Sequence, residues 1–149
     1  MVPADEQVAQ TLDLELGASV IVLERLRFVD EEPWVLVTTY LPFEIAPGLL
    51  TDDLENQSLY GLLEQKYGVQ LRYGQRAIEA SIAGAALARS LGISPGDPVL
   101  VLRSTVYGNQ RPVEMFVAYH RGDRSRFEVS LNRSTAAILE REPMMRVTT

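Results

Sequence analysis

One supersecondary pattern occurs twice in the chain, at a constant offset of 79 residues. Residues 4–40 (ADEQVAQTLDLELGASVIVLERLRFVDEEPWVLVTTY) align without a gap with residues 83–119 (AGAALARSLGISPGDPVLVLRSTVYGNQRPVEMFVAY). The identities include Gly17/Gly96, Val20/Val99, Leu23/Leu102, Pro33/Pro112 and Tyr40/Tyr119. Glycines, prolines and aliphatic residues that agree on one offset indicate two copies of one unit. Because the period is too long for a solenoid, we expect a single domain with internal pseudo-symmetry.

Each copy predicts the same order of elements: a short helix, a strand, a polar turn and a returning strand. Apolar residues at helical spacing predict the helices, and a glycine (Gly17, Gly96) follows each one, where an unusual backbone conformation costs least. Polar turns between β-rich runs indicate hairpins. The predicted strands are Val20–Phe28, Trp34–Leu41, Val99–Tyr107 and Val113–Arg121. The fold class is therefore α+β, built from two helix-strand-strand units.

The segment between the copies predicts a third helix and a further strand. Ser58 is a favourable N-cap, and Gly68 supplies a stop. The apolar stripe between them consists of Leu59, Leu62, Leu63 and Tyr67. Val69–Ala83 then reads as a long strand that leads into the second copy. Since a strand precedes the second copy, the symmetry predicts an equivalent strand before the first, upstream of Met1.

The C-terminal part of the chain departs from the repeat. Arg121–Phe127 (RGDRSRF) predicts a tight turn whose arginines form structural ion pairs. FEVSLNR (127–133) alternates as a final strand, whereas residues 134–149 have no clear pattern and fit a frayed helix or a partner-contacting arm. We expect a domain over residues 1–133 and a tail over residues 134–149.

Composition restricts the function. A chain of 149 residues with 46% hydrophobic content can bury one core. The absence of cysteine excludes disulfides, thiolate metal sites and cysteine nucleophiles, and it fits a reducing cytoplasm. There is no apolar run of roughly 18 residues, so we expect no membrane span. A net charge of −6 argues against DNA binding by this chain itself, which requires clustered Lys and Arg.

Two arginines form the first candidate site. Arg25 and Arg27 are two residues apart on a predicted strand, so their side chains share one face. Two guanidinium groups on one face can hold a phosphate or carboxylate, although a solvated face paired with nearby acids explains the same spacing. Ser58 is compatible with both an N-cap and an anion contact at a helix start.

The strand Pro112–His120 carries the second candidate site. Its alternation places Val113, Met115, Val117 and Tyr119 on one apolar face and Glu114, Phe116, Ala118 and His120 on the other. Glu114 is either a solvent-facing side chain or part of a pocket floor. The first copy has Val35 and Leu41 at the positions of Glu114 and His120, so these polar residues distinguish the second copy and predict a pocket.

Four segments together carry a family resemblance. They are RLRFVDEEPWVLVTTYLPFEIAPGL (25–49), NQSLYGLLEQKYGV (56–69), AALARSLGISPGDPVLVLRSTVYGNQRPVE (85–114) and VEMFVAYHRGDRSRFEV (113–129). The combination resembles the UTRA domain of GntR-type transcriptional regulators of the HutC subfamily. This resemblance implies a chorismate-lyase-like antiparallel sheet with packed helices. It also implies that the chain binds a small-molecule effector, of the sugar phosphate or carboxylate class, and controls an attached winged helix-turn-helix domain that this sequence does not contain.

The resemblance also implies roles for single residues. Family members with sugar-phosphate effectors place two arginines at the positions of Arg25 and Arg27, and the family's Ser-x-Tyr motif matches Ser58 and Tyr60. A ligand-contacting carboxylate matches Glu114. His120 departs from the pattern, since the matching position is often a tyrosine. Val37 departs as well, because amino-sugar-phosphate binders can carry a glutamate there.

Two other functions stay open from the sequence alone. A chorismate-lyase-like fold allows an enzyme, but the chain shows no Ser-His-Asp spacing, no metal-ligand cluster and no glycine-rich phosphate loop. We therefore expect neither catalysis nor a cofactor. The domain could instead be a dimerisation module without a ligand. A homodimer is expected in either regulatory case, because dimer symmetry mirrors paired half-sites on DNA.

Overall fold

The structure, a computed structural model, describes residues 1–54, 57–130 and 144–148 and has α+β architecture, as predicted. Its elements are β1 (Val2–Pro3), α1 (Glu6–Leu12), β2 (Ser19–Val29), β3 (Glu32–Pro42), the 3-10 turns η1 (Phe43–Ile45) and η2 (Leu49–Thr51), α2 (Leu59–Gln65), β4 (Tyr73–Ile82), α3 (Ala85–Leu91), β5 (Pro98–Gly108), β6 (Arg111–Arg121), β7 (Arg126–Ser130) and β8 (Met144–Thr148).

The predicted repeat is confirmed element by element. α3, β5 and β6 have the bounds of α1, β2 and β3, each displaced by 79 residues. A bulge interrupts the β2–β3 pairing at Arg27/Phe28, and the corresponding bulge lies at Val106/Tyr107. The hairpin turns correspond as well, since Asp30–Glu31 and Asn109–Gln110 all have positive φ. Positive φ at both central residues matches the twist of the flanking strands.

The six-stranded antiparallel sheet has the order β1-β2-β3-β6-β5-β4. Thr38 of β3 pairs with Val117 of β6, and these two residues occupy the same position in the two copies. A pseudo-two-fold axis therefore passes between them and exchanges the halves of the sheet. β1 pairs with β2 in the same register in which the last two residues of β4 pair with β5. The longer strand that the symmetry predicts at this place stays a prediction.

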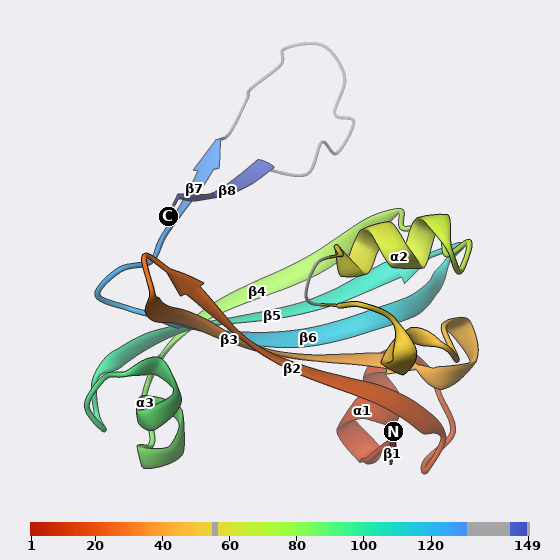
Figure 1. Ribbon diagram of the computed structural model, residues 1–149, viewed down its shortest axis with the longest axis horizontal. Helices are drawn as coiled ribbons and strands as arrows, with labels where there is room; N and C mark the ends of the chain where they lie inside the picture. The colour runs from red at the N-terminus through yellow and green to blue at the C-terminus, as the bar shows by residue number, and fades with distance from the viewer. Residues whose placement is uncertain (55–56, 131–143, 149) are drawn as a thin grey trace.

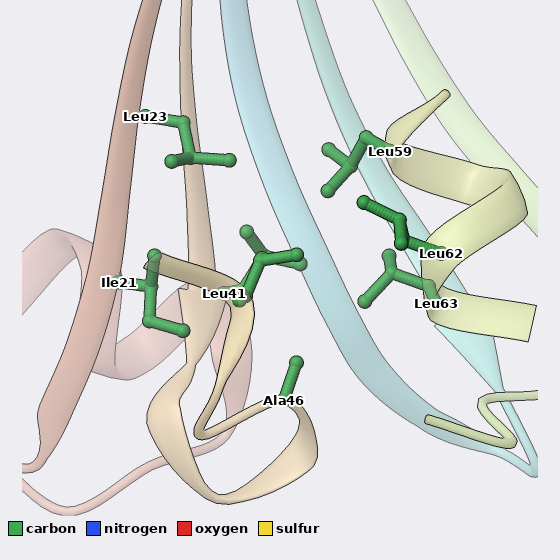
Figure 2. Close-up of a cluster of buried hydrophobic side chains, with 8 residues drawn as sticks. Ile21, Leu23, Leu41, Ala46, Leu59, Leu62 and Leu63 are labelled. Carbon is green, nitrogen blue, oxygen red and sulfur yellow. The ribbon is translucent and has the colours of Figure 1, made fainter. Parts of the chain in front are cut away.

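The helices cover the two faces of the sheet unequally. α1 and α3 lie on one face, near opposite ends of the strands, whereas α2 lies on the opposite face over one end (Figure 1). Leu59, Leu62 and Leu63 of α2 are buried in one cluster with Ile21, Leu23 and Leu41 of the first hairpin. Figure 2 shows these side chains facing one another. The linker between the copies thus covers one end of this face of the sheet.

Ser58 is the N-cap of α2, as predicted, and its hydroxyl accepts a hydrogen bond from the Gly61 amide at 3.4 Å. The following strand begins later than the sequence indicated, at Tyr73 rather than Val69. The Val69 amide instead donates to the Leu63 carbonyl at the end of α2, so the chain reaches the sheet only beyond that bond.

The arginines of the predicted turn after β6 form ion pairs with acidic residues of the same chain. Arg121 is 9% exposed, and its guanidinium donates to both carboxylate oxygens of Asp123, at 3.0 and 2.7 Å. Arg124 pairs with Glu32 at 2.7 Å.

Residues 127–130 of the expected final strand belong to β7, and its residues 131–133 lie outside the described residues. Of the tail, residues 134–143 and 149 also lie outside them. Residues 144–148 form β8, antiparallel to β7, so the helical interpretation is wrong for that part. Within the described ranges, no helix is both long and apolar enough to cross a bilayer.

Candidate functional site

A cavity of about 510 Å³ lies beside the start of α2, on the same face of the sheet. Its floor comes from β2, β3, β5 and β6, and the start of α2 forms one wall. The lining residues are Arg25, Arg27, Phe28, Val29, Trp34, Val35, Val37, Thr39, Ser58, Leu59, Tyr60, Leu102, Glu114, Phe116, Ala118 and His120. Three separate segments of the sequence therefore meet at one site.

All six residues predicted from the sequence line this cavity. Arg25 and Arg27 come from β2, Ser58 and Tyr60 from the start of α2, and Glu114 and His120 from β6. Strand alternation explains the placement, because the face that holds Glu114 and His120 is also the face of Arg25 and Arg27. The structure brings the candidates together; their contact with a ligand stays a prediction.

Glu114 is a buried carboxyl group paired with Tyr60. It is 1% exposed, and the Tyr60 hydroxyl donates to its Oε2 at 2.7 Å. Burial raises the pKa of Glu114, while the Tyr60 hydrogen bond and the charges of Arg25 and Arg76 act in the opposite direction. Burial together with the Glu114 charge also raises the pKa of Tyr60, which therefore keeps its proton. The pair joins α2 to the floor of the cavity.

Arg25 and Arg27 present unneutralised positive charge to the cavity. Within the described part of the chain neither forms an ion pair, and Arg25 Nε is buried without a hydrogen-bond partner. Burial lowers the pKa of Arg25 and repulsion from Arg27 lowers it further, whereas the Glu114 carboxyl and Tyr60 act in the opposite direction. Among the described residues neither arginine forms the ion pair with a nearby acid that the alternative interpretation allows, although Arg27 is exposed, as on a solvated face. An anion between the two groups would offset both burial and repulsion.

His120 lies at the opposite side of the floor from α2. It is 6% exposed, and neither ring nitrogen has a hydrogen-bond partner among the described residues. Its ring packs edge-on against Phe127 of β7, with ring centroids 5.1 Å apart. Burial lowers the pKa of His120, so the ring is neutral at physiological pH.

The sequence did not reveal the apolar part of the lining. Simple alternation places Trp34 and Val35 on opposite faces, yet both line the cavity. The bulge explains this, since Arg27 pairs with Val35 and Phe28 with Pro33, which leaves Trp34 as the extra residue. A bulge leaves no signal in hydrophobic alternation. Thr39 was also missed; it is fully buried, and its hydroxyl has no partner among the described residues.

The UTRA domain family matches residues 1–126, most of the chain. The chain belongs to the UTRA domain family. This UTRA domain is 33% identical over 147 residues to the HTH-type transcriptional regulator Rv0792c of Mycobacterium tuberculosis, covering 93% of the chain and 54% of that protein. It spans about half the length of the curated relatives it matches.

Solved structures agree with the assignment. The C-terminal domain of the histidine utilization repressor from Pseudomonas syringae pv. tomato superimposes with a TM-score of 0.81 at 26% identity, covering 89% of this chain and 95% of that one. The effector domain of PhnF from Mycobacterium smegmatis gives 0.76 at 30% identity, covering 82% and 75%. These matches confirm the resemblance to GntR-type regulators of the HutC subfamily and the fold that it implied.

Proposed function

We propose that the chain is the ligand-sensing domain of a bacterial transcriptional regulator and binds a small anionic effector in the cavity between α2 and β6. Arg25 and Arg27 hold the anion. Tyr60 and Glu114 contact polar atoms of the ligand, Ser58 lies at its anionic end, and His120 contacts its far end. The chain acts by binding, without catalysis and without a cofactor.

The observation that carries the proposal is the convergence of unpaired polar groups on one cavity. A buried guanidinium nitrogen and two buried imidazole nitrogens lack partners in the described structure, although buried polar groups are normally hydrogen-bonded. A ligand supplies such partners. In the described residues there is no group of three or more His, Asp or Glu side chains that could hold a metal ion.

Thermal unfolding in the presence of anions tests this function. Phosphate, short carboxylates and sugar phosphates are titrated separately, and a bound anion raises the melting temperature in a concentration-dependent manner. Arg25→Ala and Arg27→Ala are expected to abolish the rise, whereas Arg89→Ala, on exposed α3, keeps it. A rise that persists in the Arg25 and Arg27 variants contradicts the proposal. Mass analysis of the recovered ligand distinguishes binding from turnover.

The remaining parts of the proposal concern the whole regulator. Residues 1–133 form the effector domain and residues 134–149 a tail; an upstream winged helix-turn-helix domain contacts DNA. The regulator is a cytoplasmic homodimer. The upstream domain is supported by two relatives that are named HTH-type regulators, because this chain spans only about half of each. Light scattering on the chain is expected to give twice its mass of 16.6 kDa.

A further inference from the structure

One row of paired residues crosses the floor of the cavity from a charged end to an apolar end. The row consists of Arg25 on β2, Val37 on β3, Ala118 on β6 and Leu102 on β5. All four residues line the cavity. Neighbouring strands lie about 4.8 Å apart, so the row extends about 14 Å from the arginine to the leucine. Beyond the arginine, the row offers no hydrogen-bonding side chain.

The surroundings of this row are apolar as well. Val35 and Trp34 flank Val37 on β3, and Phe116 precedes Ala118 on the same face of β6. Most of the polar groups lie on β2 and at the start of α2. Three polar residues lie beside the row: Thr39 on β3 and Glu114 on β6 lie towards α2, and His120 lies at the other end of β6, where its ring is buried against Phe127.

We propose that the effector is an amphipathic anion: a carboxylate or phosphate head held by the two arginines of β2, and an apolar body that lies across β3, β6 and β5. This inference rests on the proposed effector-binding function and names its ligand class. A sugar body fits the row poorly, because its hydroxyl groups would lose water against Val37, Ala118 and Leu102 without gaining partners. An alkyl or aromatic body buries apolar surface there instead.

A homologous series of ligands measures the apolar contact directly. Isothermal titration with acetate, butanoate, hexanoate, octanoate and decanoate, below their micelle concentrations, is compared with glucose 6-phosphate and inorganic phosphate. We expect the affinity to rise by up to about fourfold per added methylene until the chain has crossed the row. Glucose 6-phosphate is expected to bind no more tightly than inorganic phosphate.

Two substitutions locate the effect on the row. Ala118→Leu fills its centre and is expected to reduce octanoate affinity at least tenfold while phosphate binding persists. Val37→Thr keeps the side-chain shape but replaces one methyl group by a hydroxyl group. It is expected to weaken the binding of octanoate and to leave the binding of phosphate unchanged. Val22→Thr is the matched control, because Val22 is half-buried on the opposite face of the sheet. Melting curves verify that each variant is folded.

The outcomes separate the two proposals. The amphipathic ligand is refuted if the affinity for the carboxylates does not depend on their chain length, or depends on it equally in Ala118→Leu. The anion-binding function still stands in that case if glucose 6-phosphate binds in an Arg25-dependent manner. If no anion binds, or if Arg25→Ala leaves all binding unchanged, both proposals fail. A chain-length dependence that requires both Ala118 and Arg25 supports both.

Discussion

Glu114 and His120 line the same cavity, and burial shifts their pKa values in opposite directions. Burial disfavours the charged form of each group, so it raises the pKa of the carboxyl and lowers the pKa of the imidazole. Both side chains replace an apolar residue of the first copy, namely Val35 and Leu41. The fold therefore tolerates two groups that are easiest to bury when neutral, and their effects on stability have distinct pH profiles.

Glu114→Gln is expected to gain stability relative to the wild type as pH rises. Because the pKa of Glu114 is raised in the folded state, the wild type loses stability as pH increases from about 4.5 through that raised value. Glutamine stays neutral and keeps an oxygen that accepts from the Tyr60 hydroxyl. Urea denaturation between pH 4 and pH 8 measures the difference in the free energy of unfolding.

The exposed Glu24→Gln substitution on β2 is the control for this experiment. A difference between Glu114→Gln and the wild type that stays constant with pH would show that the buried carboxyl titrates normally.

Tyr60→Phe is expected to lower the free energy of unfolding by about 1–3 kcal/mol, since it leaves the Glu114 carboxyl group without its hydrogen-bond donor. The same urea denaturation measures this loss.

His120→Leu is expected to show the opposite dependence. The pKa of His120 is lowered in the folded state, so the wild type loses stability as pH falls from about 6.5 towards that lowered value. Leucine is the residue of the first copy and does not titrate. The gain in the free energy of unfolding from His120→Leu, measured by urea denaturation, is therefore larger at pH 5.5 than at pH 8. An equal gain at both values contradicts a buried neutral ring.

At this scale the sequence predicted charged and polar site residues better than apolar ones. Arg25, Glu114 and His120 are conspicuous because charge or polarity interrupts an apolar strand. Val37 and Ala118 look the same whether they line a cavity or fill a core. Trp34 was missed for a different reason, since the bulge that redirects it depends on pairing between two strands and not on its own neighbours.

The helices and hairpins of the two copies show how different residues satisfy one backbone geometry. α1 ends at Asp13 and α3 at Gly92, and both residues adopt the left-handed conformation, with φ of 53° and 64°. Glycine adopts this conformation without strain, whereas a residue with a Cβ does not. The first copy therefore carries a small cost that the second avoids.

Asp13→Gly is expected to stabilise the chain by about 0.5–1 kcal/mol, because it removes the Cβ strain at the end of α1. Gly92→Ala is expected to lose stability, since alanine is strained at this positive φ and its Cβ would lie 3.4 Å from Pro33 Cγ. Thermal unfolding of both variants compares the two copies directly. A loss of stability in Asp13→Gly would indicate that the aspartate side chain, rather than its backbone, matters there.

The elements themselves were the most predictable part of the structure. Two independent copies gave two chances to recognise each helix and hairpin, and both copies have identical bounds. The strand after α2 was placed four residues too early, because its apolar pattern begins at Val69, whose amide still donates to the Leu63 carbonyl at the end of α2. β8 was missed because it has no counterpart in the repeat.

For the whole molecule, the decisive property is that the cavity joins segments far apart in the sequence. β2, the start of α2 and β6 each contribute two of the predicted site residues. A ligand that contacts all three would link α2 to both halves of the sheet, and we expect it to reduce the motion of these elements relative to one another. Such a change can reach an attached domain only if the two arrangements bind the ligand unequally.

Hydrogen exchange measured with and without octanoate tests this linkage. We expect slower exchange in β2, the first turn of α2 and β6 together, and little change in α1 and α3, which lie on the opposite face (Figure 1). The control is hydrogen exchange of Arg25→Ala measured in the presence of octanoate. Slower exchange spread evenly over α1, α3 and the sheet would show general stabilisation instead of a site between these elements.

The pseudo-two-fold axis between Thr38 and Val117 has a consequence for how such a domain can diversify. The repeat gives two equivalent positions on one face of the sheet, and the leucines of α2 occupy the first of them, against Leu23 and Leu41. The second is free to accept an outside molecule. Substitutions at Leu102 or His120 can thus alter the cavity while their counterparts Leu23 and Leu41 stay packed against α2, so part of the ligand site can change without disturbing the core that α2 completes.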